Sequence, residues 1–284
     1  MINEIQAKGN DNRWWQPNCE NCFGLCCVAL PFGRSSEFAE DKAGGKPCKN
    51  LRGDYRCGIH DKLRTKGFKG CTVFECFGAG QKVSQFTFKG VSWQDNVAVA
   101  KDMFNVFPIM QQLHEMLYYL EEALQLHAAK EIRQELEAVF QKISRLTELE
   151  PQELMDLNIP ETRVIVNALL VKASELLRQK IITEKSERSK GRKKKKGSDL
   201  IGANLRNLDL RGESFRGAWL IAADLRKADL RCVDFIGADL RDADIRGADL
   251  RNSIFLTQVQ LNAAKGDKDT KIPSAFIQPA HWTY

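Results

Sequence analysis

Apolar side chains recur at two different periods along the chain, and each period predicts a different kind of structure. Between residues 86 and 184 the spacing is three and four, which places apolar side chains on one face of a helix. The first such stripe consists of Met103, Phe107, Met110, Leu113, Leu117, Leu120 and Leu124. The second consists of Ile132, Leu136, Val139, Phe140, Ile143 and Leu146, and the third, which starts at Pro160, of Val164, Ile165, Ala168, Leu169, Leu176 and Leu177. We therefore expect a helical hairpin or bundle over residues 86–184.

From residue 203 onward the apolar positions recur every five residues. Eleven pentads run without a gap to residue 257, and the centre of each is Leu, Ile or Phe. The residue two positions before the centre is Ala in seven pentads, the one before it is Asp in seven, and the one after it is Arg in eight. A period of five fits neither a helix nor a strand, so the chain must turn a corner at each pentad. The pattern predicts an interior of alternating large and small side chains and outer columns of opposite charge.

These pentads, among them Ala223-Asp-Leu-Arg-Lys227 and Ala238-Asp-Leu-Arg-Asp242, resemble the pentapeptide-repeat family. The resemblance implies a right-handed quadrilateral β-helix over 198–257, a solenoid with four pentads in each coil. Residues 258–284 are similar to the C-terminal tail of such proteins, and we expect them to form a cap in which Phe276 and Trp282 cover the last coil. The expected fold class is multidomain α+β: a small Cys-rich domain, a helical hairpin or bundle, and the β-helix.

Eight of the nine cysteines lie in residues 1–85, and the ninth, Cys232, lies in the repeats. The chain starts without the basic-then-apolar order of a secretion signal, so we expect a cytoplasmic protein whose thiols stay reduced. Clustered free thiols are typical metal ligands, and the adjacent Cys26 and Cys27 can point to opposite sides and serve two neighbouring centres. The predicted ligands of this metal-binding domain are Cys19, Cys22, Cys26, Cys27, Cys48, Cys57, Cys71 and Cys76.

The sequence leaves the metal open. Eight thiolates suffice for two zinc sites with four cysteine ligands each, or for one iron–sulfur cluster with structural cysteines left over. His60 is an alternative ligand, although we interpret it as a surface histidine. The run Cys19-Glu-Asn-Cys22-Phe-Gly-Leu-Cys26-Cys27 and the later Cys48, Cys57 and Cys71 resemble the zinc- or iron-chelating cysteine-cluster family over residues 19–80. That family has eight cysteines and usually opens Cys-x-x-Cys-x-x-Cys-Cys, whereas here three residues precede the Cys-Cys pair.

The charge of the chain is concentrated in one short segment. The formal net charge is +6, and residues 185–197 hold eight Lys or Arg and one Glu. We interpret 185–197 as a solvated basic linker and the only place where nucleic acid could bind. Residues 198–257 hold ten acidic and nine basic side chains, which disfavours mimicry of an acidic DNA duplex. No apolar run approaches the roughly 20 residues of a membrane helix, so we expect no membrane insertion.

These patterns favour a non-catalytic protein that serves as a scaffold or interaction module for an unidentified protein partner. The partner could also be a second copy of the chain, in a homodimer formed through the helical region. Two alternative functions remain: an antibiotic-resistance protein that protects a topoisomerase by DNA mimicry, and an iron–sulfur enzyme of redox or methyl-transfer chemistry. The sequence has no Gly-x-Gly-x-x-Gly loop, no phosphate-binding Gly-Lys-Ser/Thr motif and no Ser/His/Asp constellation in a credible context. We therefore predict no catalytic residue.

Overall fold

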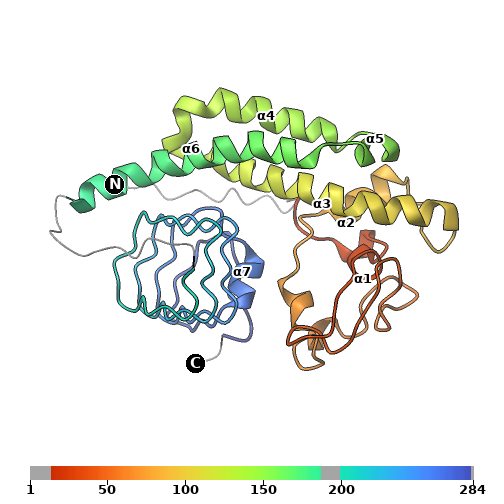
Figure 1. Cartoon of the computed structure of the whole chain (residues 1–284), viewed down its shortest axis with the longest axis horizontal. Helices are drawn as coiled ribbons and strands as arrows, with labels where there is room; N and C mark the ends of the chain where they lie inside the picture. The colour runs from red at the N-terminus through yellow and green to blue at the C-terminus, as the bar shows by residue number, and fades with distance from the viewer. Residues whose placement is uncertain (1–13, 187–198, 283–284) are drawn as a thin grey trace. The chain divides into compact units, whose positions relative to one another are not determined.

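The computed structural model describes residues 14–186 and 199–282, which Figure 1 draws in colour. The chain divides into two compact units. One comprises Asn10–Glu121 and Gln134–Ala168, and the other comprises Glu122–Arg133 and Leu169–Tyr284. The first unit holds the eight clustered cysteines, and the second holds the repeats.

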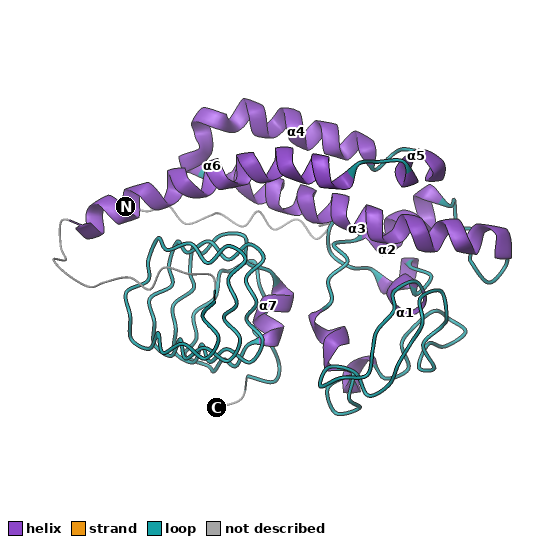
Figure 2. Ribbon diagram, in the orientation of Figure 1, coloured by secondary structure: helices purple, strands orange, loops and turns teal. Residues whose placement is uncertain are grey.

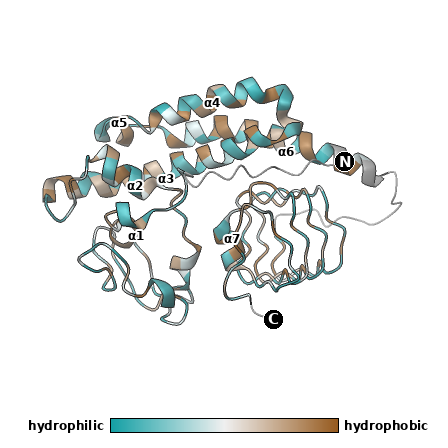
Figure 3. Ribbon diagram, turned by 180° about the vertical axis from the view of Figure 1, so that it is seen from behind, coloured by the Kyte–Doolittle hydropathy of each residue, from teal (hydrophilic) through white to brown (hydrophobic). Residues whose placement is uncertain are grey.

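Three long helices occur at the places where the apolar stripes predict them: α3 (Val97–Gln125), α4 (Arg133–Leu146) and α6 (Ile159–Ser186). The first stripe is buried as expected, with Met103, Met110 and Leu113 fully inside. Figure 3 shows the corresponding mixture of hydrophobic and hydrophilic residues along these helices. The third stripe is partly wrong, because Val164 and Ile165 are 69% and 41% exposed. The buried side of α6 is formed instead by Val166, Leu169, Leu170 and Ala173.

The remaining helical segments are short, and several were not predicted. α5 (Pro151–Met155) starts with a proline, a favoured first helical residue, and has a capping box between Glu150 and Glu153. The other α-helices are α1 (Leu25–Val28), α2 (Ala79–Gln81) and α7 (Gln258–Ala263). The 3-10 helices are Cys19–Asn21, His60–Lys62, Lys69–Val73 and His127–Ile132, and Lys82–Thr87 is a π-helix.

The prediction of a right-handed quadrilateral β-helix over 198–257 is wrong. Residues 199–282 contain no strand and no sheet, and Figure 2 accordingly colours the repeats as loop. Successive coils are joined by isolated parallel β-bridges, most of them between residues twenty positions apart, such as Asp224 with Asp244. Further backbone hydrogen bonds between coils accompany them, such as that from the Asn207 N–H to the Arg226 carbonyl at 3.0 Å. The fold class is therefore helical, with a repeat region built of stacked turns.

The physical reason lies at the fifth position of each pentad. This residue has a positive φ at Asn207, Lys227, Cys232 and Asp242, and at four glycines including Gly217. A left-handed residue every five positions bends the chain before a second consecutive bridge can form, so no ladder develops. Cys232 is therefore a buried corner residue.

The interior of the repeat region follows the predicted alternation of large and small residues. Ala223 and Leu225 are both fully buried, and so are Ala248 and Leu250. At the C-terminal end Trp282 joins this core and donates its indole N–H to the carbonyl of Ala264 at 3.0 Å, while Phe276 packs against it. These contacts cover apolar side chains of the repeat region.

Two further features follow from the described residues. Within 14–186 and 199–282, no helix has both the length and the apolarity that a membrane crossing requires. The predicted basic linker, 185–197, lies outside the described residues from position 187 onward.

Candidate metal centres

The cysteine region has little regular structure of its own. Its segments are held by short helical turns and by isolated antiparallel bridges between Phe32 and Lys42 and between Leu51 and Cys57. Few apolar side chains are fully buried there, among them Leu25 and Val28. A region with so small a core gains stability from a bound metal or from disulfides, and all eight of its cysteines are free thiols.

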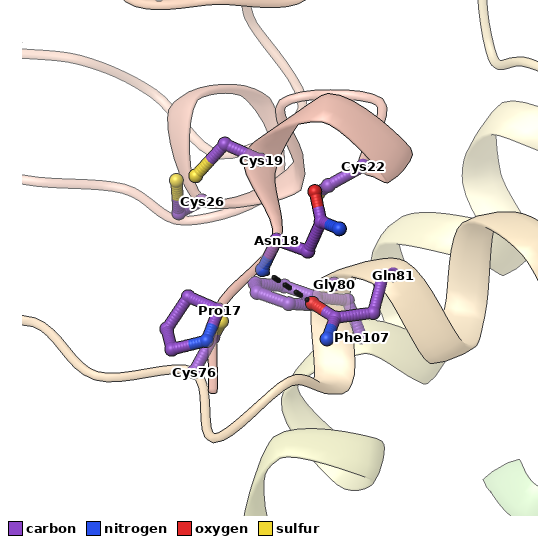
Figure 4. A pocket seen from close by; sticks show the side chains of 9 residues that line it. All are labelled: Pro17, Asn18, Cys19, Cys22, Cys26, Cys76, Gly80, Gln81 and Phe107. Atoms are coloured by element: carbon purple, nitrogen blue, oxygen red, sulfur yellow. Dashed lines mark hydrogen bonds between the residues drawn. The ribbon is translucent and has the colours of Figure 1, made fainter. Parts of the chain in front are cut away.

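Four of the thiols line one small cavity, and we call them the first cysteine set: Cys19, Cys22, Cys26 and Cys76. The cavity has a volume of about 30 Å³, and its other lining residues are Pro17, Asn18, Gly80, Gln81 and Phe107. Figure 4 shows the sulfur atoms of Cys19 and Cys26 extending to the same side of the cavity. A volume of this order accommodates particles of the size of a water molecule.

Backbone amides support two sulfur atoms of the first set. The N–H groups of Gly24 and Leu25 donate to the Cys22 sulfur, and those of Gly78 and Gly80 donate to the Cys76 sulfur. Such bonds favour the thiolate, the form that binds metals. Burial acts in the opposite direction and dominates, since it raises the pKa of Cys76 to about 12.

The segment that follows Cys76 contacts Cys22 of the first cysteine set through Ser84 and Gly80. Ser84, fully buried in the π-helix, hydrogen-bonds to the Cys22 sulfur and accepts the N–H of Phe23 at 3.0 Å. A Cβ added at Gly80 would lie only 2.7 Å from the Cys22 sulfur. The close approach of this helix backbone to a thiol therefore requires glycine at position 80.

The other four thiols form the second cysteine set: Cys27, Cys48, Cys57 and Cys71. Burial, with smaller contributions from the charges of Cys27, Cys48 and Cys57, raises the pKa of Cys71 to about 12. Four thiols within electrostatic reach of one another constitute a concentrated set of soft ligands. The Ile59 N–H donates to the Cys57 sulfur.

Local contacts fix the segments of the second set. The Cys48 amide donates to the Cys27 carbonyl at 2.9 Å, and the Asn50 amide group lies 3.7 Å from the Cys48 sulfur. The N–H of Leu51 in turn bonds to the Cys48 carbonyl at 2.9 Å. Cys27 and Cys48 are therefore held side by side although twenty-one residues separate them.

The neighbours Cys26 and Cys27 belong to different sets. Their sulfur atoms are 3.8 Å apart, and the hydrogen bond between them raises the pKa of Cys26 and lowers that of Cys27. The charge of Cys27 also raises the pKa of Cys19 and Cys26, so the two sets interact electrostatically. That an adjacent pair serves two neighbouring centres stays a prediction.

The thiols of each set are near one another, but their sulfur atoms do not have the geometry of a metal site. Over residues 14–186 and 199–282, no group of three or more His, Cys, Asp or Glu side chains is arranged so that it could hold a metal ion. The two sets are defined by the shared cavity and by electrostatic proximity. Metal binding would have to bring the sulfur atoms closer, to the roughly 2.3 Å of a Zn–S bond.

The histidines do not add to either set. His60 is exposed, as expected of a surface residue. His114 is buried in α3, where its Nδ1 lies 2.7 Å from the carbonyl of Phe77, the residue after Cys76. Burial lowers the pKa of His114 to about 4, so this ring is neutral near pH 7. Its contact with the Phe77 carbonyl makes His114 a structural residue that holds the segment next to Cys76.

Sequence reasoning missed the residues that support the thiols. Ser84, Gly80 and Lys42 are not metal ligands by residue type, and the spacing of the cysteines does not single them out. The segment after Cys76 forms helical turns over Ala79–Gln81 and Lys82–Thr87, which the sequence analysis did not predict.

Comparison with known proteins identifies the class from the repeats. A family model described as pentapeptide repeats matches residues 198–231 and 218–255, with eight copies. The chain is therefore a protein with pentapeptide repeats. It is also 57% identical over 282 residues to "Uncharacterized protein YybG" of Bacillus subtilis (strain 168), a match that covers 99% of this chain and 100% of that protein. The chain belongs to the same family as YybG.

Proposed function

We propose that the two cysteine sets bind one metal ion each and that the protein acts as a non-catalytic scaffold or interaction module in the cytoplasm. The observation that supports the proposal is that four of the eight free thiols, Cys26 among them, line one cavity, while Cys71 interacts electrostatically with Cys27, Cys48 and Cys57. Four thiolates complete a tetrahedral site without a position left open for substrate. A closed site of this kind stabilises a fold and does not catalyse a reaction.

The donor atoms fit a thiophilic metal. Sulfur ligands select zinc, iron or copper(I) over magnesium and calcium. Amide N–H groups bonded to Cys22, Cys57 and Cys76 resemble the outer contacts that orient thiolate ligands. We take zinc as the metal because two separate sets of four suit two mononuclear sites, and because such sites supply folding energy to regions with a small core.

The surface of the repeat region supports an interaction module better than a duplex mimic. Six aspartates each bind the arginine two residues later, with nitrogen–oxygen distances of 2.5–2.8 Å, including Asp224–Arg226 and Asp229–Arg231. Each negative charge is thereby neutralised locally. A DNA mimic would need unpaired acidic side chains in rows, since the phosphate backbone supplies most of the charge that DNA-binding proteins recognise.

The metal test uses the full-length chain, purified without oxygen. We expect two zinc ions per chain by mass spectrometry and no visible absorption. Cys76→Ser and Cys71→Ser should each retain about one ion, because each removes a ligand from one set only. Iron with sulfide and a brown chromophore would favour the iron–sulfur alternative. A wild-type chain without metal, or a single-cysteine variant that loses both ions, would contradict the two-set proposal.

The interaction test is separate from the metal test. Cross-linking of the zinc-loaded chain in cells of its source should capture a specific protein, and variants at the exposed face of the repeats should reduce that capture. Inhibition of a topoisomerase by the purified chain would instead favour the alternative of DNA mimicry.

A further inference from the structure

Lys42 is a lysine in an unusual place. Only 8% of its surface is exposed, although lysine is rarely buried. It pairs with Phe32 in an isolated antiparallel bridge, and its ammonium nitrogen lies 5.6 Å from the centre of the Phe32 ring. A buried ammonium requires hydrogen-bond acceptors or an opposite charge, because its desolvation is costly.

Three backbone carbonyls satisfy the ammonium. The Lys42 nitrogen donates to the carbonyls of Val28 at 3.1 Å, Ala43 at 3.2 Å and Lys46 at 3.0 Å. An ammonium has three donors, so these contacts use all of them. Val28 follows Cys27 directly, and Lys46 precedes Cys48 by two residues. The head of Lys42 therefore joins the two segments that carry these thiols.

The charge of Lys42 acts on Cys27. The lysine lowers the pKa of that thiol, after the larger effects of the Cys26 hydrogen bond, which also lowers it, and of burial, which raises it. In return Cys48, Cys27 and Cys26 favour the charged form of Lys42 against its burial. The hydrogen bonds to Val28 and Lys46 hold this positive charge beside the segments of Cys27 and Cys48.

We propose that Lys42 is a positioning residue of the second cysteine set, which ties the Cys27 and Cys48 segments together and offsets part of the negative charge of four thiolates around one metal ion. This inference rests on the proposed function. Four thiolates around Zn²⁺ carry a net charge of 2−, and a fixed cation nearby stabilises that charge in a partly buried site.

The test compares Lys42→Met with Lys46→Met. Methionine keeps an unbranched side chain only one heavy atom shorter than lysine and removes the charge and the three donors. Lys46 lies on the same loop with an exposed side chain, so its variant makes the same change in net charge without removing the buried ammonium. We expect Lys42→Met to weaken one of the two zinc ions by about 10- to 100-fold in competition with a chromophoric chelator, and Lys46→Met to match wild type.

A double-mutant cycle assigns the effect to one set. In the Cys76→Ser background only the second set is complete, and Lys42→Met should weaken the remaining ion. In the Cys71→Ser background only the first set is complete, and Lys42→Met should leave the ion unchanged. Retention of that ion also shows that the region folds with the lysine replaced. Equal effects in both backgrounds would overturn the inference.

Lys42→Arg separates the charge from the hydrogen bonds. Arginine keeps the positive charge but its planar group does not reproduce three converging ammonium donors. We expect its zinc affinity to lie between those of wild type and Lys42→Met, whereas equal losses in both variants would exclude a contribution of the charge. If wild type binds two ions and Lys42→Met binds both as tightly, only the Lys42 inference fails. If wild type binds none, the proposed function fails with it.

Discussion

Gly80 is the residue at which the packing around the first cysteine set is tightest. An alanine Cβ there would lie 2.7 Å from the Cys22 sulfur, a distance that non-bonded atoms do not tolerate. We expect Gly80→Ala to displace Cys22 and to reduce the zinc content from two ions to about one per chain. Metal analysis of the purified variant measures this.

Gly53→Ala is the matched control for Gly80→Ala. A Cβ at Gly53 has no atom within 4 Å, and this glycine lies in the same region of the chain. The control should keep both ions and change the unfolding free energy by less than about 0.5 kcal/mol, as is usual for surface substitutions. Two ions in Gly80→Ala would show that Cys22 can move without loss of the site.

Glu122 is a carboxyl group whose protonation should affect stability. Its Oε1 accepts the N–H of Phe255 at 2.8 Å, and burial, with a smaller effect of Asp234, raises its pKa from the ordinary 4.5 to about 8. Between these two values the folded chain holds one proton more than the unfolded chain, so stability falls as the pH rises through this window.

Glu122→Gln should therefore be more stable than wild type at pH 9 and similar to it at pH 4.5. Each unit of the raised pKa corresponds to about 1.4 kcal/mol, and we expect a gain of at least that amount at pH 9. Denaturant unfolding at the two pH values measures it. Glu131→Gln, at an exposed position, is the control and should show no such difference. A Glu122→Gln variant that is no more stable at pH 9 would falsify this assignment.

Single residues show what the sequence can and cannot predict about the candidate site. The eight thiols could be selected because cysteine is rare and clustered, and Cys26-Cys27 indicated two centres. Ser84 and Lys42 could not, because each reaches a cysteine segment from a distant position only once the chain is folded. Their residue types have many other roles, so no local pattern distinguishes them.

Among the elements, the coils of the repeat region should depend on their interior more than on their charged surface. Leu230 is fully buried, and we expect Leu230→Ala to cost about 2–5 kcal/mol of unfolding free energy. The neighbouring Arg231 binds Asp229 at 2.6 Å with 39% of its side chain exposed, so Arg231→Ala should cost no more than about 1 kcal/mol. Urea unfolding monitored by circular dichroism measures both.

Similar losses of unfolding free energy in Leu230→Ala and Arg231→Ala would mean that the charged surface stabilises the coils as much as their interior does. The columns of Asp–Arg pairs also reach between coils, as in Arg211–Asp229 at 3.5 Å, and a cooperative network would make each arginine more costly to remove. Arg211→Ala in the Arg231→Ala background distinguishes the two cases, because isolated pairs predict that the two costs add, whereas a network predicts a total that differs from their sum.

The elements also show why the fold was only partly predictable. The period of five correctly indicated buried centres and a corner at each pentad, because both follow from which side chains avoid water. It could not indicate whether the backbone between corners forms strands, since that depends on φ at the fifth position, where Lys227 and Cys232 adopt left-handed values that neither residue favours. The exposed Val164 and Ile165 likewise show that a stripe identifies a helix more reliably than its buried face.

At the scale of the whole molecule, the cysteine region and the repeat region derive their stability from different sources. The repeat region has a continuous core that includes Leu220, Phe235 and Leu250. The cysteine region has short helical turns and eight thiols that, in our proposal, need metal to hold them. Removal of metal should therefore affect one region and spare the other.

Hydrogen exchange measures this difference segment by segment. After treatment of the zinc-loaded chain with a chelator, we expect the amides of residues 17–81 to lose protection while those of 199–282 keep it. Added zinc should restore the protection, because the chelator removes only the metal and leaves the reduced cysteine ligands in place. The Cys71→Ser, Cys76→Ser double variant should resemble the chelated chain before any chelator is added. Protection that persists in 17–81 without metal would mean that hydrogen bonds such as those of Ser84 and Lys42 hold the region by themselves, and that its cysteines are not structural metal ligands.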